Sequence, residues 1–185
     1  YDNSIEWVSK QNGGLITRFE KKKVFNSDGE KIKGDFIHII PEQKAGKIIF
    51  DSKLCNNDWC TINPQTFQLL NFKDIYAVGD SVDAGDMPKS AFSAESQAKI
   101  LSLNLINRIL QKSYLNPVFL NTCYSFSSND RAFSITSWYK LNTMKDRIVS
   151  LGSSQSSDDG LNDERIREAK EAFGWYESIT KTLYG

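Results

Sequence analysis

The sequence predicts an α+β fold, with short strands first, a long helix in the middle, and an antiparallel sheet with a terminal helix at the carboxy end. Three observations predict it. β-prone runs separated by glycine turns occupy the first forty residues. A helical apolar pattern begins at Ser90. Beyond Pro117, strand-like runs return and lead to a second helical pattern near Asp163.

The first forty residues are expected to be β structure. The β-prone runs are Ile5–Val8 and Leu15–Phe19, and the turn Asn12–Gly14 separates them. A second turn follows at Ser27–Glu30. Asp35–Ile40 is predicted to be a buried strand that stops at Pro41. His38 lies within that run, so we expect a hydrogen-bonded core histidine rather than a catalytic one.

The middle of the chain is expected to hold a short strand and a long helix. Asp74–Val78 is a short apolar run that ends at Gly79-Asp80. From Ser90 to about Gln111, apolar residues recur at helical spacing: Ala94, Ala98, Leu101, Leu105 and Ile109. Pro88 and Ser90 are typical helix-start residues.

The carboxy-terminal part is expected to be a hairpin, a loop and a helix. The two strands of the hairpin are Val118–Phe126 and Ala132–Leu141, and the turn between them is Ser127–Asp130. Ser153–Gly160 is rich in Ser, Asp and Gly and is predicted to be a mobile loop. The terminal helix should begin near Asp163 as its N-cap, with Ile166, Ala169 and Phe173 on one face.

Composition excludes several classes of protein. Lys plus Arg equals Asp plus Glu, at 23 each, so we do not expect nucleic-acid binding, and Lys21–Lys23 is the only basic run. No apolar run approaches the roughly 18 residues of a membrane helix, so no membrane insertion is expected. The chain opens without Met or a leader, so either a leader was removed or the chain is a piece of a longer one.

The chain has three cysteines, Cys55, Cys60 and Cys123, and a single histidine. Cys55 and Cys60 form a C-x4-C pair with no second pair behind it, so we expect no metal site. An odd number of cysteines indicates a free thiol or a partner outside the chain.

The segment Asp74–Ser96 carries the chemistry. A strand ending in Gly79-Asp80, followed by a loop and a helix, places a carboxylate where it can bond a sugar-alcohol hydroxyl. The helix N-terminus supplies amide N–H groups and partial positive charge. In flavoproteins, this combination holds the ribityl chain and stabilises the negative charge of the reduced ring. Taken alone the pattern is weak, because Asp turns after strands are common.

Further motifs accompany it in a fixed order: Ile39–Gly46, Asp58–Phe67, Met87–Ser90, Ser93–Lys99, Asn121–Ser125 and Gly174–Tyr176. Together they resemble the carboxy-terminal half of the flavoprotein subunit of flavocytochrome c sulfide dehydrogenase, among the two-dinucleotide-domain flavoproteins. The resemblance covers nearly the whole chain. It implies FAD as cofactor, sulfide oxidation to sulfur, single-electron transfer to a c-type cytochrome subunit and a periplasmic location.

The resemblance also implies domains and site residues. Residues 1–45 would end a nucleotide-domain-like region, 46–112 would complete the FAD domain, and 113–185 would form an interface domain. Cys60 would be one of a redox-active cysteine pair whose other member lies upstream of this chain. Gly79 and Asp80 would contact the ribityl chain, with Met87, Pro88, Lys89 and Ser90 beside the ring. Trp175 would couple flavin to cytochrome, although docking of the terminal helix explains it equally well; Cys123 is expected to be packing.

The sequence departs from the family pattern in three ways. Glu42 stands at a usual proline, and Cys55 is an extra thiol that could form a disulfide with Cys60. No G-x-G-x-x-G turn occurs, so these residues offer no site for the FAD pyrophosphate.

Two alternative functions remain. A quinone-linked sulfide reductase would need a membrane-facing carboxy-terminal region, for which the last helix is too acidic, with Asp163, Glu164, Glu168, Glu171 and Glu177. The second alternative is a dimerisation or docking module that binds no flavin.

Overall fold

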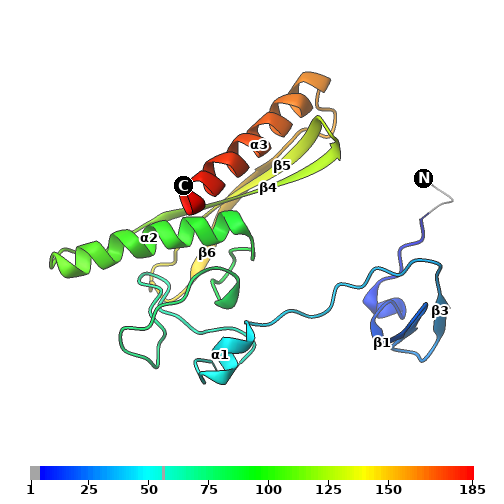
Figure 1. Cartoon of the computed structure of the whole chain (residues 1–185), viewed down its shortest axis with the longest axis horizontal. Coiled ribbons are helices and arrows are strands. Elements are labelled where there is room, and N and C mark those ends of the chain that lie inside the picture. The colour runs from blue at the N-terminus through cyan, green and yellow to red at the C-terminus, as the bar shows by residue number, and fades with distance from the viewer. Residues whose placement is uncertain (1–4, 56) are drawn as a thin grey trace. The chain divides into compact units, whose positions relative to one another are not determined.

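The computed structural model describes residues 5–55 and 57–185 and divides into two compact units, Tyr1–Glu42 and Gln43–Gly185 (Figure 1). The α+β class predicted from the sequence is confirmed, since each unit contains a three-stranded antiparallel sheet and the second ends in a long helix. The predicted regions 1–45, 46–112 and 113–185 stay predictions as to their identity. Within the described ranges, no helix is long and apolar enough to cross a membrane.

The first unit is a small sheet in the order β1-β2-β3, preceded by the short helix η1. The elements are η1 Lys10–Asn12, β1 Ile16–Glu20, β2 Lys23–Asn26 and β3 Lys31–Lys33. Asn26, 4% exposed, shapes the turn after β2, because its side-chain oxygen accepts the N–H groups of Asp28 and Glu30 at 3.1 and 2.8 Å. The predicted turns and the strand at Leu15–Phe19 are therefore confirmed.

Three predictions for this unit are wrong. Ile5–Val8 is not a strand. Asp35–Ile40 is not a strand either, and its Phe36 and Ile40 are 86% and 82% exposed. His38 is exposed as well, so it is not a core histidine. A strand needs a hydrogen-bonded neighbour, and the sheet formed by the described residues of this unit does not include Asp35–Ile40.

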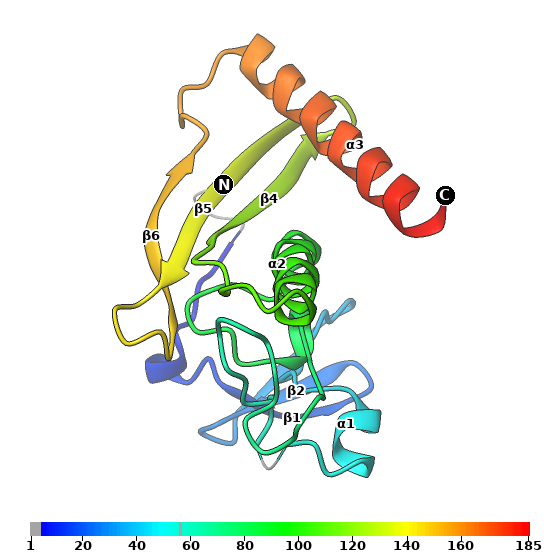
Figure 2. The ribbon, with the colours of Figure 1, turned by 90° about the vertical axis from the view of Figure 1, so that its left-hand side faces the viewer.

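The second unit packs two helices against an antiparallel sheet in the order β4-β5-β6. Its elements are α1 Lys47–Asp51, η2 Gly79–Ser81, α2 Ala91–Ile109, β4 Val118–Ser128, β5 Arg131–Leu141, β6 Ile148–Gln155 and α3 Asn162–Tyr184. Figure 2 shows α3 along the β4–β5 hairpin and α2 beside the beginning of β4. The predicted long helix and hairpin are confirmed.

The core of this unit joins the sheet to the segment before α2. Five of its side chains are each 0% exposed: Cys60, Phe67, Val82, Phe119 and Ile148. The rings of Phe67 and Phe119 meet edge to face, with centroids 5.8 Å apart. The segment from residue 60 to 82 is held mainly by isolated bridges, Cys60↔Val82, Ile62↔Leu69 and Gln68↔Tyr76.

Three local predictions are corrected. Asp74–Val78 is not a strand, since only Tyr76 pairs, through a single bridge to Gln68. Residues 153–155 belong to β6 rather than to a loop, because they pair with Ile135–Ser137 of β5. The cap of α3 is Leu161, and Asp163 lies in the first turn, where its charge suits the helix dipole.

The face of α3 that packs on the sheet differs from the expected one. Glu168, Ala169 and Ala172 are buried, whereas Phe173 is 53% exposed. Glu168 accepts hydrogen bonds from the Ser134 hydroxyl at 2.9 Å, from the Ser156 hydroxyl, and from Arg165 at 3.2 Å. This carboxylate therefore links α3 to β5 and to the segment after β6.

Glu168→Gln is expected to lower the free energy of unfolding by about 2 kcal/mol, because a buried charge-assisted acceptor is lost. Burial of Glu168 acts to raise its pKa, but hydrogen bonds from Ser156, Ser134 and Arg165 prevail and leave the pKa below its ordinary 4.5. The contribution is therefore present above that value and is lost as pH falls through the folded-state pKa. Urea unfolding at several pH values measures it.

Glu171→Gln is the matched control, since its carboxylate is on the same helix, 53% exposed, and 3.6 Å from Arg167. It should change stability by less than about 0.5 kcal/mol. Equal effects of the two substitutions at neutral pH would contradict the account of Glu168.

Candidate functional site

The loop that runs from η2 to the start of α2, residues 79–90, contains the predicted cofactor residues and is held by one buried side chain. Gln97 of α2 is 1% exposed. Its side-chain oxygen accepts the N–H of Gly79 at 2.7 Å, and its amide nitrogen donates to the sulfur of Met87 at 3.8 Å. Gly79 has φ +75°, and a Cβ there would lie 3.1 Å from the Cβ of Ala94. The loop is thus fixed to α2 near both ends, and its first residue favours glycine.

Two carboxylates of this loop, those of Asp80 and Asp83, interact with Lys89. Its ammonium group donates to the carbonyl of Val82 at 2.6 Å and lies 3.8 Å from the centre of the Trp59 ring. Burial lowers the pKa of Lys89, while the carboxylates of Asp80 and Asp83 act to raise it. Asp80 is exposed, so its carboxylate is open to a ligand as well as close to this cation.

Cys60 lies directly beneath the same loop. It is 0% exposed. Its N–H donates to the carbonyl of Ser81 at 2.9 Å, and its carbonyl accepts the N–H of Asp83 at 3.0 Å. Burial, followed by the neighbouring Cys55, raises the pKa of Cys60. A free Cys60 thiol therefore keeps its proton at neutral pH and is a poor nucleophile in this setting.

The N-terminus of α2 is tied to β4. The hydroxyl of Ser90 accepts the N–H of Ser93 at 3.1 Å and donates to the side-chain oxygen of Asn121 at 2.5 Å. The Ser93 hydroxyl donates to the same oxygen at 3.2 Å. Asn121 is 3% exposed. The cap predicted at Ser90 is confirmed, and its side chain also joins the helix to the sheet.

An apolar pocket of about 540 Å³ opens beside this helix terminus. It is lined by Ser90, Ala91, Phe92, Thr122, Cys123, Tyr124, Phe126, Ala172, Phe173, Trp175 and Tyr176. Trp175 stacks on Phe92 with centroids 5.4 Å apart and planes 16° from parallel. The buried Nε1 of Trp175 has no hydrogen-bond partner among the described residues. A polar atom buried in an aromatic pocket without a partner is a feature that a ligand acceptor would satisfy.

The structure groups the predicted site residues in two places. Cys60, Gly79, Asp80 and Lys89 surround one end of the loop, and Met87 joins them through Gln97. Ser90 and Trp175 share the apolar pocket, whereas Pro88 is exposed between the two groups. Trp175 also packs α3 against Phe92, which is the helix-docking role that the sequence offered as its alternative. Cys123 lines the pocket rather than the core.

Sequence reasoning missed three residues of the site. Gln97, Asn121 and Phe92 organise the loop, the helix cap and the stacked tryptophan. Gln97 and Asn121 do fall within the motifs Ser93–Lys99 and Asn121–Ser125. The available signal was therefore a polar residue inside an otherwise apolar element, a pattern that often marks a buried hydrogen-bonding role.

The carboxy-terminal part of the chain matches a known protein family. Residues 115–183 match the model of the family described as flavocytochrome c sulphide dehydrogenase, flavin-binding. The matched segment contains β4, β5, β6 and nearly all of α3, and it contributes Thr122–Tyr124, Phe126, Ala172, Phe173, Trp175 and Tyr176 to the apolar pocket. The match confirms the resemblance found in the sequence, and its description agrees with the predicted flavin cofactor. The carboxy-terminal part of this chain, residues 115–183, is therefore similar to the flavin-binding family of flavocytochrome c sulphide dehydrogenase.

Proposed function

We propose that this chain is part of a periplasmic FAD-dependent sulfide dehydrogenase that oxidises sulfide to sulfur and passes the electrons to a c-type cytochrome. One observation carries the proposal. The start of α2 and the family-matched segment meet at an apolar, aromatic pocket, next to the loop that bears Asp80. Aromatic walls, a helix N-terminus and a nearby carboxylate suit a ring that is apolar at one edge and gains negative charge on reduction.

The residues present fit the flavin end of FAD. The pocket volume of about 540 Å³ lies within the range of small-molecule sites. Asp80 would hold a ribityl hydroxyl, and Met87, Pro88, Lys89 and Ser90 would lie beside the ring. Bound FAD would supply the chemistry of accepting two electrons and releasing them one at a time. The pyrophosphate would need a glycine-rich turn that these 185 residues do not contain.

Cys60 is proposed as one member of the disulfide that sulfide attacks. Its raised pKa argues against a role as the attacking thiolate. In a disulfide with a second cysteine from elsewhere in the protein, the sulfur of Cys60 needs no deprotonation to take part. Hydrosulfide then attacks one sulfur, a persulfide forms, and the other cysteine leaves as a thiolate. Asp80 and Lys89 lie near Cys60 and give the loop above it a polar surface that hydrosulfide can reach.

Trp175 is proposed to lie on the path of electrons to the cytochrome. It lines the flavin-end pocket, and its neighbour Tyr176 is 62% exposed. Farther along α3, Leu183 and Tyr184 are 64% and 84% exposed. Exposed aromatic and aliphatic side chains beside a cofactor pocket are the composition expected where a redox partner docks.

Asp80→Ala in the full-length protein is expected to weaken FAD binding by about 1.5–3 kcal/mol, or roughly 10- to 150-fold in Kd, because a charge-assisted hydrogen bond to the ribityl chain is lost. Fluorescence titration of the flavin-stripped protein with FAD measures it. Unchanged affinity would contradict the ribityl role.

Asp83→Asn is the matched control for Asp80. Both carboxylates interact with Lys89, so an effect that acts only through that cation should appear in both variants. The Asn side chain keeps an acceptor for the Gly85 N–H, which Asp83 accepts at 3.1 Å. Asp83→Asn should therefore change FAD affinity by less than about threefold, which corresponds to well under 1 kcal/mol.

A further inference from the structure

Two free cysteines, Cys55 and Cys60, are brought together by the loop that follows α1. The chain reverses at the end of this helix, where Lys53 has φ +55° and the N–H of Leu54 donates to the carbonyl of Ile49 at 3.0 Å. The base of the loop is closed by Ala45, whose N–H donates to the carbonyl of Asp58 at 2.8 Å. The backbone thus holds Cys55 inside a loop closed between Ala45 and Asp58, and Cys60 lies two residues beyond that closure, fixed to Ser81 and Asp83 by its backbone hydrogen bonds.

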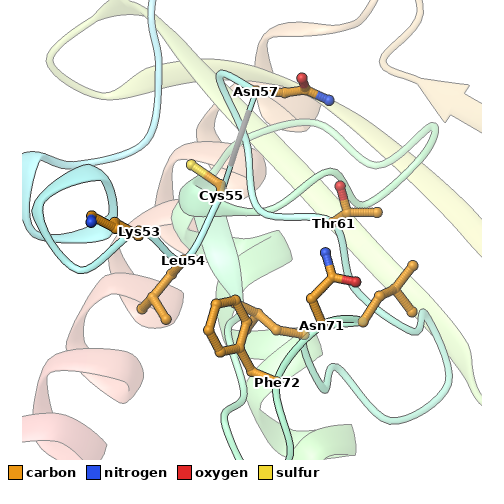
Figure 3. Close-up of a pocket in the computed structure, with 9 residues that line it drawn as sticks. Lys53, Leu54, Cys55, Asn57, Thr61, Asn71 and Phe72 are labelled. Atoms are coloured by element: carbon orange, nitrogen blue, oxygen red, sulfur yellow. The ribbon is translucent and has the colours of Figure 1, made fainter.

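The two thiols are neighbours but differ in exposure. Cys55 packs against the core cluster that contains Cys60, and the pKa of the Cys60 thiol is raised first by burial and then by Cys55. Cys60 is 0% exposed. Cys55 is partly exposed and lines a pocket of about 290 Å³, shown in Figure 3 with its other lining side chains. The pocket also presents polar groups of Lys53, Asn57 and Asn71.

We propose that Cys55 and Cys60 form a dithiol redox site that takes a small-molecule disulfide as its oxidant. This site is additional to the sulfide chemistry proposed above and does not depend on it. Cys55 reacts first, because it alone of the two faces solvent. Cys60 reacts second and completes the internal disulfide.

The two steps balance in atoms and electrons. In the first, the Cys55 thiolate attacks one sulfur of the external disulfide, a Cys55–S–S–R bond forms, and one thiolate RS⁻ leaves. In the second, which is the slow step because burial raises the pKa of Cys60, the small thiolate fraction of Cys60 attacks the sulfur of Cys55, the Cys55–Cys60 bond forms, and the second RS⁻ leaves. The protein loses two electrons, the external disulfide gains them, and the protons of the two thiols pass to the departing thiolates.

The site has a consequence for Cys60. When Cys60 is bonded to Cys55, it cannot pair with any other cysteine. In a sulfide dehydrogenase built as proposed above, oxidation by external disulfides would therefore switch the sulfide reaction off, and reduction would restore it.

The test uses the reduced 185-residue chain, oxidised glutathione, and intact-protein and peptide mass spectrometry. The wild type is expected to acquire an internal Cys55–Cys60 disulfide and a glutathione adduct on Cys123, the exposed thiol of β4. Cys123→Ser should acquire the internal disulfide alone. In Cys60→Ser, the first intermediate should be trapped as a stable adduct on Cys55.

Two results would overturn the proposal. One is a wild-type chain that keeps glutathione on Cys55 at long times without an internal disulfide. The other is absence of a Cys55 adduct in both Cys60→Ser and Cys60→Ala, provided that circular dichroism shows native folding. The wild-type result needs no variant to fold, and the assay contains neither flavin nor sulfide. Its failure therefore leaves the proposed sulfide dehydrogenase function standing, and failure of that function leaves this site standing.

Discussion

Cys60→Ser in the full-length, FAD-loaded protein is expected to abolish sulfide oxidation while the flavin stays bound. Serine cannot form the disulfide that hydrosulfide attacks, so the covalent route is closed. Removal of a covalent participant commonly costs at least about 10³-fold in turnover. The cofactor contacts proposed for Asp80 and the α2 terminus do not involve this side chain, so the flavin content should be unchanged. Sulfide-dependent reduction of cytochrome c, with the visible flavin spectrum as a loading check, measures both.

Cys55→Ser is the control for this prediction. Cys55 is a free thiol that is proposed neither as a flavin contact nor as part of the disulfide that hydrosulfide attacks, so its loss should leave turnover within about twofold, a change of less than about 0.5 kcal/mol in activation free energy. Near-normal sulfide turnover in Cys60→Ser would contradict the assignment of Cys60.

Phe119→Ala is expected to destabilise the second unit by about 3–5 kcal/mol. Phe119 is 0% exposed on β4, and its ring meets that of Phe67 edge to face at 5.8 Å. Loss of the ring opens a cavity where the sheet meets the bridged segment before α2, and it removes an aromatic pair as well. Urea unfolding followed by tryptophan fluorescence measures the change.

Phe133→Ala on β5 is the matched control, because this ring is 41% exposed. Its loss should cost roughly 1 kcal/mol or less, as expected for a partly exposed apolar side chain. Similar costs at the two positions would contradict the assignment of Phe119 to the core.

The elements predicted correctly are those whose signals lie in a short stretch of sequence. Ser90 caps α2 with its own side chain, and the β4–β5 hairpin turns at Ser127–Asp130, where polar turn residues separate two alternating runs. β6 escaped prediction because it is largely exposed and polar, and it is a strand because its backbone pairs with β5, as in Trp138↔Gly152. Pairing of that kind depends on a distant partner.

The candidate site likewise has local features that the sequence predicted and long-range contacts that it did not. The Gly79-Asp80 and Met87–Ser90 motifs pointed to the right loop because backbone conformation and helix start are local properties. The roles of Gln97 and Asn121 were not predicted, because each depends on partners far away in sequence: Gly79 for Gln97 and Ser90 for Asn121. The proximity of Cys55 and Cys60 likewise depends on the fold of the loop after α1. Their spacing in the sequence is compatible with that proximity but does not predict it.

The central claim is that a protein containing this chain uses a flavin to oxidise sulfide. Anaerobic titration of the full-length, FAD-loaded protein with sulfide, monitored by visible absorption, tests it most directly. We expect the absorption of the oxidised flavin to fall as sulfide is added, and to return when oxidised cytochrome c is supplied as electron acceptor. A flavin that stays oxidised in excess sulfide, yet is reduced at once by dithionite, would contradict the claim.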